Sequence, residues 1–399
     1  MRYRILFAAL ALAACSHPTN SPAPSPAPGP LGADARFDVI IENGRVVDGT
    51  GAGWYYGDVG LRGDRIAAVV PRGLLHAATA TTRVDARGLV VAPGFIDIQD
   101  QSGGQLLLGD GRQIGKITQG VTTGILGEGS TPAPLNPATL PPNATELQRR
   151  FSGPHGFGAW LSAMQAHGIS QNVGSFVGAG TIREYGMAQR MGAATGAALD
   201  SMRGAVRRAM EDGAFGMASA LIYPPNTFAT TEELIEESKA MAPYGGVYIS
   251  HMRSEADRYL EAIDEVIRIS KEGGVPGEIY HLKAAGKRNW YKAPLAIAKI
   301  DSARNAGIDI QANMYPWTAG GTGLTSCLPP KYSAEGKLYE NLASKEMRAK
   351  IREEVAHPTS EWENLCELAT PEGVLITSLR QPENQQYIGK RLAEIAKMK

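Results

Sequence analysis

The amino-acid sequence predicts an α/β protein in which a small β-sandwich precedes a TIM-like (β/α) barrel. Short runs of alternating apolar and polar residues, separated by glycine turns, fill residues 36–92 and indicate antiparallel β structure. From residue 93 onward, apolar strands alternate with helical stretches, which is the pattern of parallel β/α units. Several of these strands end in Glu, Gln or His, at the edge where such barrels place their chemistry.

The composition is that of a globular protein. At 399 residues the chain is long enough for one large and one small domain. Lys plus Arg and Asp plus Glu both number 40, so the charge gives no reason to expect a nucleic acid partner. Two cysteines outside the amino-terminal segment, Cys327 and Cys366, cannot make a disulfide-rich scaffold; they could pair or remain free thiols.

Residues 1–15 are predicted to be a lipoprotein signal peptide. Two arginines precede an apolar run too short to span a bilayer, and the run ends in Leu-Ala-Ala-Cys, a lipobox in which Cys15 is the acylated residue. The alternative is an ordinary secretory signal. Because Ser16 replaces the aspartate associated with inner-membrane retention, we expect an exported protein that faces the periplasm and touches the outer membrane only through this lipid. Residues 16–35, rich in Pro, Ser and Ala, are expected to form a disordered tether.

The barrel is predicted to occupy residues 93–399. Its candidate strands cover residues 95–100, 121–128, 172–180, 214–221, 246–253, 277–285 and 308–317. Helical segments such as 231–242 and 255–272 lie between them. The apolar run 374–379 is weighed as an eighth strand, but it carries no Asp at its end, and a helix is expected over 388–396. We therefore expect the barrel to lack its last strand and carboxyl-terminal region, which leaves two strand edges unpaired.

Three strand ends carry side chains suited to a metal ion. Glu128 ends the second candidate strand, His251 the fifth and His281 the sixth. A carboxylate and two imidazoles form a three-ligand set that leaves one position open for water. A lone histidine at a strand end is more often structural, but two in equivalent places of successive β/α units favour a metal site.

The first candidate strand follows a Pro-Gly turn and ends in Gln99 and Gln101. Alternate residues of a strand point to the same side, so the two side chains converge as a ligand pair does. A neutral amide is nevertheless a poor substitute for imidazole at zinc.

The run PGFIDIQDQ, residues 93–101, resembles the first barrel strand of the amidohydrolase superfamily, in which P-G-F-I-D precedes a metal-binding His-x-His pair. The segments DGAFGMASALIYPPN, YISHMRSE, EIYHLKAAG, MYPWTAG and GKRLAEIA are similar to those of the D-aminoacylase, or N-acyl-D-amino-acid deacylase, family over about residues 37–399. The resemblance implies a barrel of the metal-dependent hydrolase type. It also implies that metal-activated water deacylates N-acyl-D-amino acids or similar small carboxylate-bearing amides.

The resemblance further implies a role for each candidate ligand. Glu128, His251 and His281 take the positions that hold the family's tightly bound zinc. The second, weaker site uses the His-x-His pair and a late aspartate, so Gln99 and Gln101 make that site degenerate. We therefore expect one Zn²⁺ per chain.

Substrate contacts are also implied by the resemblance. Lys283 and Tyr223 occupy positions that grip the substrate carboxylate, and Tyr315 is expected to line the pocket. The family's general base is an aspartate in a Ser-Asp-Gly motif that ends the eighth strand, and we expect it beyond Lys399. The catalytic base is therefore unknown from this sequence.

Two alternatives are weighed against a zinc-dependent amide hydrolase. The first is a catalytically impaired or inactive ligand-binding lipoprotein, or a fragment, on the same amidohydrolase scaffold; the missing eighth strand favours it. The second is an enzyme of the dihydropyrimidinase type. It is disfavoured because no lysine suited to carbamylation stands in the place of Glu128.

Overall fold

The computed structural model describes residues 34–357 and 362–398 and divides into two compact units, Met1–Pro93 and Gly94–Lys399. The predicted signal peptide with Cys15, and nearly all of the predicted tether, lie outside the described residues. Among the helices of the described part, none is both long and apolar enough to cross a membrane.

The amino-terminal unit is a mixed sheet. Within residues 34–93 its strands are β1 (Arg36–Val46), β2 (Tyr55–Arg62), β3 (Arg65–Pro71), β4 (Thr79–Asp85) and β5 (Val90–Val91). Their order is β3-β2-β1-β4, and β5 also pairs with β1. The expected antiparallel pairing is found for β1–β2 and β2–β3, but β4 and β5 run parallel to β1. Alternation of apolar residues reports which face is buried and not the direction of the neighbouring strand, so the sequence could not distinguish the two.

The second unit is built on parallel strands. They are β6 (Phe95–Asp97), β7 (Val121–Leu126), β8 (Asn172–Ser175), β9 (Val177–Gly178), β10 (Gly216–Ala220), β11 (Val247–His251), β12 (Gly277–Ile279) and β13 (Ile310–Ala312). Two sheets, β6-β7-β8 and β13-β12-β11-β10-β9, contain them. Only Phe176 separates β8 from β9, so these two are halves of one barrel strand. Each of the seven predicted segments thus contains a strand of the expected barrel type, over fewer residues than the apolar run suggested.

Residues 374–379 do not form an eighth strand. Their only β pairing in the described part is an isolated antiparallel bridge from Leu375 to Arg391. The backbone of Ile376 exchanges hydrogen bonds with Gly389 and Lys390, which precede the terminal helix. The apolar run is satisfied by its own near neighbours in sequence and does not pair with β13.

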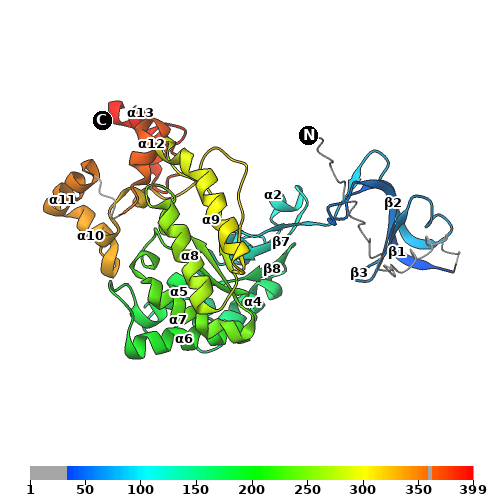
Figure 1. Ribbon diagram of the computed structural model, residues 1–399, viewed down its shortest axis with the longest axis horizontal. Helices are drawn as coiled ribbons and strands as arrows, with labels where there is room; N and C mark the ends of the chain where they lie inside the picture. Colours follow the sequence, from blue (N-terminus) through cyan, green and yellow to red (C-terminus); the bar gives the residue numbers. More distant parts are fainter. Residues whose placement is uncertain (1–33, 358–361, 399) are drawn as a thin grey trace, which may run out of the picture. The chain divides into compact units, whose positions relative to one another are not determined.

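Helices cover the outside of the strands, with α4 to α9 surrounding them (Figure 1). The α-helices are α1 (Gly103–Leu108), α2 (Ile114–Ile117), α3 (Glu146–Arg150), α4 (Gly156–His167), α5 (Ala179–Met187), α6 (Gly196–Glu211), α7 (Thr231–Met241), α8 (Tyr259–Gly273), α9 (Ala293–Asn305), α10 (Leu338–Ala343), α11 (Lys345–Ala356), α12 (Leu365–Gly373) and α13 (Leu392–Met398). Short 3₁₀ helices are η1 (Asn226–Phe228), η2 (Ala242–Tyr244), η3 (Lys287–Lys292), η4 (Leu324–Cys327), η5 (Pro330–Gly336) and η6 (Pro382–Tyr387).

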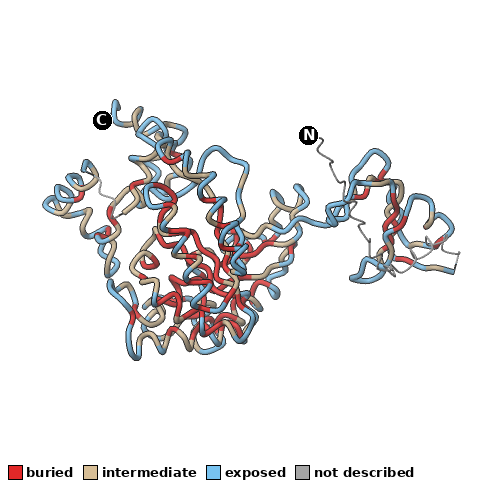
Figure 2. Tube along the Cα trace, viewed as in Figure 1, coloured by how far each residue is buried: buried red, intermediate tan, exposed pale blue. Residues whose placement is uncertain are grey.

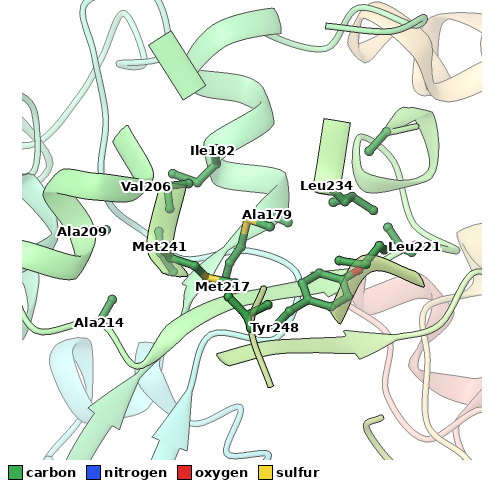
Figure 3. Packing of buried hydrophobic residues seen from close by; sticks show 14 of the residues in the cluster. Ala179, Ile182, Val206, Ala209, Ala214, Met217, Leu221, Leu234, Met241 and Tyr248 are labelled. Carbon is green, nitrogen blue, oxygen red and sulfur yellow. The ribbon is translucent and has the colours of Figure 1, made fainter. Parts of the chain in front are cut away.

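The hydrophobic core of this unit lies between the strands and the helices. Met217 of β10 and Tyr248 of β11 are fully buried against Ile182, Val206 and Leu234 of the surrounding helices (Figure 3). Buried residues concentrate along the strands and the inner sides of the helices (Figure 2). Such packing holds the carboxyl ends of β10, β11 and β12 in register, which is what a site built from strand ends requires.

The disulfide between Cys327 and Cys366 settles the open question about these cysteines. Their Cα atoms are 5.2 Å apart, and the bond joins η4 to the start of α12. Helices α12 and α13 lie side by side at the carboxyl end of the described chain (Figure 1). The disulfide therefore ties this late segment to the loops that follow β13.

Candidate metal centre

The carboxyl ends of β7, β11 and β12 bring Glu128, His251 and His281 together. Oε1 of Glu128 lies 3.3 Å from Nδ1 of His251 and 3.2 Å from Nε2 of His281. The atoms that these residues offer as ligands all lie within 4.8 Å of one another. All three side chains come from strand ends far apart in sequence, so the barrel alone creates the cluster.

Local backbone geometry fixes the carboxylate. Gly127 and Gly129 flank Glu128, and both have positive φ angles, 114° and 70°. A Cβ atom on Gly127 would lie 2.2 Å from the carbonyl oxygen of Phe176, so only glycine fits there. His281 also has a positive φ, 38°, and its backbone N–H donates to Oδ1 of Asn313 at 2.8 Å. A bulky residue held in this conformation marks a strained position of the kind found at functional sites.

The cluster fits a zinc-like cation. Two imidazoles and one carboxylate are a common zinc donor set. Nε2 of His251 is buried and has no hydrogen-bond partner among the described residues. A buried polar atom without a partner is costly unless a further group satisfies it, which a bound cation and its ligands can do.

A second carboxylate, that of Glu255, lies beside the ring nitrogen of His281 that does not face Glu128. Oε1 of Glu255 and Nζ of Lys283 each lie 2.9 Å from Nδ1 of His281, while Nε2 of the same ring faces Glu128. A carboxylate that orients a histidine in this way is the usual outer partner of a metal-binding imidazole. Sequence reasoning missed Glu255; its one signal was its place four residues after His251 in YISHMRSE.

Charge and burial oppose each other in the cluster. Burial raises the pKa of Glu128, but hydrogen bonds from His251, His281 and Gln99 outweigh it and hold the pKa well below its ordinary value. Burial likewise raises the pKa of Glu255, while the nearby His251, His281 and Lys283 lower it to about 2. Burial lowers the pKa of His281, yet Glu128 and Glu255 leave it above its ordinary value. The surroundings therefore favour the ionised form of both carboxylates.

Gln99 and Gln101 converge, as their alternation in the sequence predicted. Nε2 of Gln99 donates to Oε2 of Glu128 at 2.8 Å, and Nε2 of Gln101 donates to the same oxygen at 2.5 Å. The two amides therefore bind the carboxylate itself. One oxygen of Glu128 faces the imidazoles and the other faces the amides.

The predicted substrate-binding residues lie beside the histidines. Nζ of Lys283 donates to Oε1 of Glu255 at 2.5 Å and lies 5.3 Å from the ring centre of Tyr315. The ring of Tyr223 lies 5.3 Å from that of His251, and its hydroxyl is 2.8 Å from Oγ1 of Thr322. The structure thus brings these three residues to the cluster, but Lys283 already has a carboxylate partner there.

Comparison with known proteins finds related amide hydrolases, while no family model matches the chain. The chain is 38% identical over 293 residues to the D-aminoacylase of Alcaligenes xylosoxydans xylosoxydans, covering 72% of this chain and 59% of that protein. It is therefore similar to somewhat more than half of that relative's length.

Two solved structures are also similar. One belongs to a D-aminoacylase studied for the functional role of its binuclear metal centre, with one-metal activation and second-metal attenuation. It is 33% identical, with a TM-score of 0.66, and the match covers 79% of this chain and 69% of that one. The other is N-acyl-D-glutamate deacylase from Bordetella bronchiseptica, complexed with zinc and a phosphonate mimic of the tetrahedral intermediate. It is 27% identical, with a TM-score of 0.71, over 91% of this chain and 67% of that one.

Proposed function

Because the chain belongs to the D-aminoacylase family of amidohydrolases, we propose that it serves metal-dependent hydrolysis of the amide bond in N-acyl-D-amino acids. The observation that carries the proposal is the convergence of Glu128, His251 and His281, with an orphaned buried nitrogen on His251. The similar proteins described above, two D-aminoacylases and an N-acyl-D-glutamate deacylase, support the choice of substrate class.

The proposed cofactor is a single Zn²⁺. The nitrogen and oxygen donors suit zinc, and the amides of Gln99 and Gln101 occupy the outer oxygen of Glu128. Zinc bound there supplies a Lewis acid for the substrate carbonyl and lowers the pKa of a coordinated water. Glu255, which lies 2.9 Å from Nδ1 of His281, holds that ring with Nε2 toward the site.

Lys283, Tyr223 and Tyr315 are proposed to bind the substrate. The ammonium of Lys283 donates to Glu255 and lies within hydrogen-bond distance of Nδ1 and of the carbonyl oxygen of His281, so binding of a substrate carboxylate exchanges one of these partners for the substrate. The two tyrosine rings flank His251 and His281 and supply apolar walls on either side. No residue in the described part of the chain is assigned as the general base.

With zinc added, we expect the chain to hydrolyse N-acetyl-D-methionine and to leave the L enantiomer untouched. Release of free methionine measures both reactions, and Lys283→Ala is expected to raise KM more than it lowers kcat because it removes a ground-state contact. Zinc binding without hydrolysis of the D enantiomer supports instead an impaired or inactive ligand-binding protein. Equal rates on both enantiomers contradict a D-amino-acid deacylase.

We also propose that lipid on Cys15 anchors the protein at the outer membrane, facing the periplasm. The support is the lipobox Leu-Ala-Ala-Cys, followed by Ser16. In cells given labelled fatty acid, the wild-type chain is expected to carry the label and to sediment with outer membranes. Cys15→Ala is expected to lose the label, and a labelled Cys15→Ala chain rules out acylation at this residue.

A further inference from the structure

Glu363, which lies just before α12, contacts the turn that follows β11. Its Oε2 accepts hydrogen bonds from Oγ of Ser254 at 2.7 Å, from the backbone N–H of Glu255 at 2.8 Å and from that of Ala256 at 3.0 Å. A carboxylate that accepts three donors in one turn fixes the position of that turn strongly. The central residue of the three is Glu255, whose side chain orients His281.

The segment that carries Glu363 is itself anchored at several points. Cys366 is bonded to Cys327, and Glu367 pairs with Arg288 at 2.8 Å. Asn364 caps α12 through the N–H of Glu367. A carboxylate on a mobile loop could not hold another turn in place, whereas these anchors make Glu363 a fixed support.

We propose that Glu363 is a positioning residue for the metal centre: it holds the turn 254–256, the turn holds Glu255, and Glu255 holds the ring of His281 in its ligand orientation. The inference rests on the proposed metal-dependent function. Glu363 would thus contribute to the affinity of the site for its cation, although it lies 108 positions away from Glu255 in sequence.

The test is zinc affinity, measured by competition with a chromophoric chelator at fixed pH. Loss of an outer partner of a ligand histidine weakens metal binding about 10- to 100-fold, and we expect Glu255→Ala to fall in that range. Because Glu363 acts one step further out, Glu363→Ala is expected to weaken zinc binding about 10-fold. Glu363→Gln keeps an oxygen that accepts from the turn and is expected to restore most of the affinity.

Glu346→Gln is the matched control. It alters an exposed carboxylate of α11 that pairs with Lys350 on the same helix and belongs to none of these anchors, so zinc affinity is expected to stay at the wild-type value. In the Glu255→Ala background, adding Glu363→Ala is expected to have no further effect, because the two residues act in series. Ser254→Ala, which removes one donor, provides a milder variant if Glu363→Ala does not fold.

Two results overturn the inference. The first is wild-type zinc affinity in folded Glu363→Ala. The second is that Glu363→Ala weakens zinc binding by the same factor in the wild-type and Glu255→Ala backgrounds. Failure of the proposed function shows differently, as a wild-type chain that binds no zinc or hydrolyses no substrate. If zinc binds without hydrolysis, the affinity ratios among the variants still decide the role of Glu363.

Discussion

Replacing His281 by alanine is expected to reduce bound zinc from about one ion per chain to almost none and to abolish amide hydrolysis. The change removes the imidazole whose Nε2 lies 3.2 Å from Glu128 and leaves two ligands, too few for tight binding. Loss of a Lewis acid removes several kcal/mol of transition-state stabilisation, which corresponds to a fall in rate of about 1,000-fold or more. Metal analysis of the purified protein and the rate on N-acetyl-D-methionine measure the two effects.

The control for this variant is His167→Ala. His167 ends α4, is exposed, and bonds only the carbonyl oxygen of Gly109 among the described residues, so its loss removes a histidine of similar chemistry away from the cluster. Zinc content and rate are expected to match the wild type in the control. Full zinc occupancy in folded His281→Ala shows that the cation is held elsewhere and contradicts the assigned site.

The barrel strands could be predicted because each is a short apolar run bounded by turns. The five residues of β10, for example, are all buried, and burial is what an apolar run reports. The run 374–379 gave the same signal but bonds to residues 389 and 390 instead. Periodicity shows that a segment is buried and extended, but it does not show which neighbour it pairs with.

The convergence of Glu128, His251 and His281 could be predicted because barrel topology places strand ends at one edge. Predicting it needed no knowledge of individual side-chain contacts. Glu255 and Glu363 differ, because their roles arise from contacts between a turn and a segment far away in sequence. Nothing in the local pattern around Glu363 indicates such a contact, so only the structure reveals it.

Replacing both Gln99 and Gln101 by histidine is expected to raise the zinc content from about one ion per chain to about two. In the wild type both amides donate to Oε2 of Glu128, at 2.8 and 2.5 Å, so two side chains already converge on an oxygen that the histidines do not use. Imidazoles at these positions turn two donors of hydrogen bonds into two metal ligands beside a carboxylate oxygen. The first site keeps Oε1 of Glu128 with His251 and His281, so its occupancy is expected to persist.

The matched control is Gln99→Ala with Gln101→Ala, which removes the same hydrogen bonds without supplying ligands. Zinc-to-protein ratios after gel filtration are expected to stay near one in this control and to approach two in the double histidine variant. If the alanine pair loses the first ion, the amides serve mainly to hold Glu128 in its ligand orientation. If the folded histidine variant binds only one zinc ion per chain, the prediction is wrong. Two imidazoles at positions 99 and 101 beside Glu128 are then not sufficient to bind a second ion.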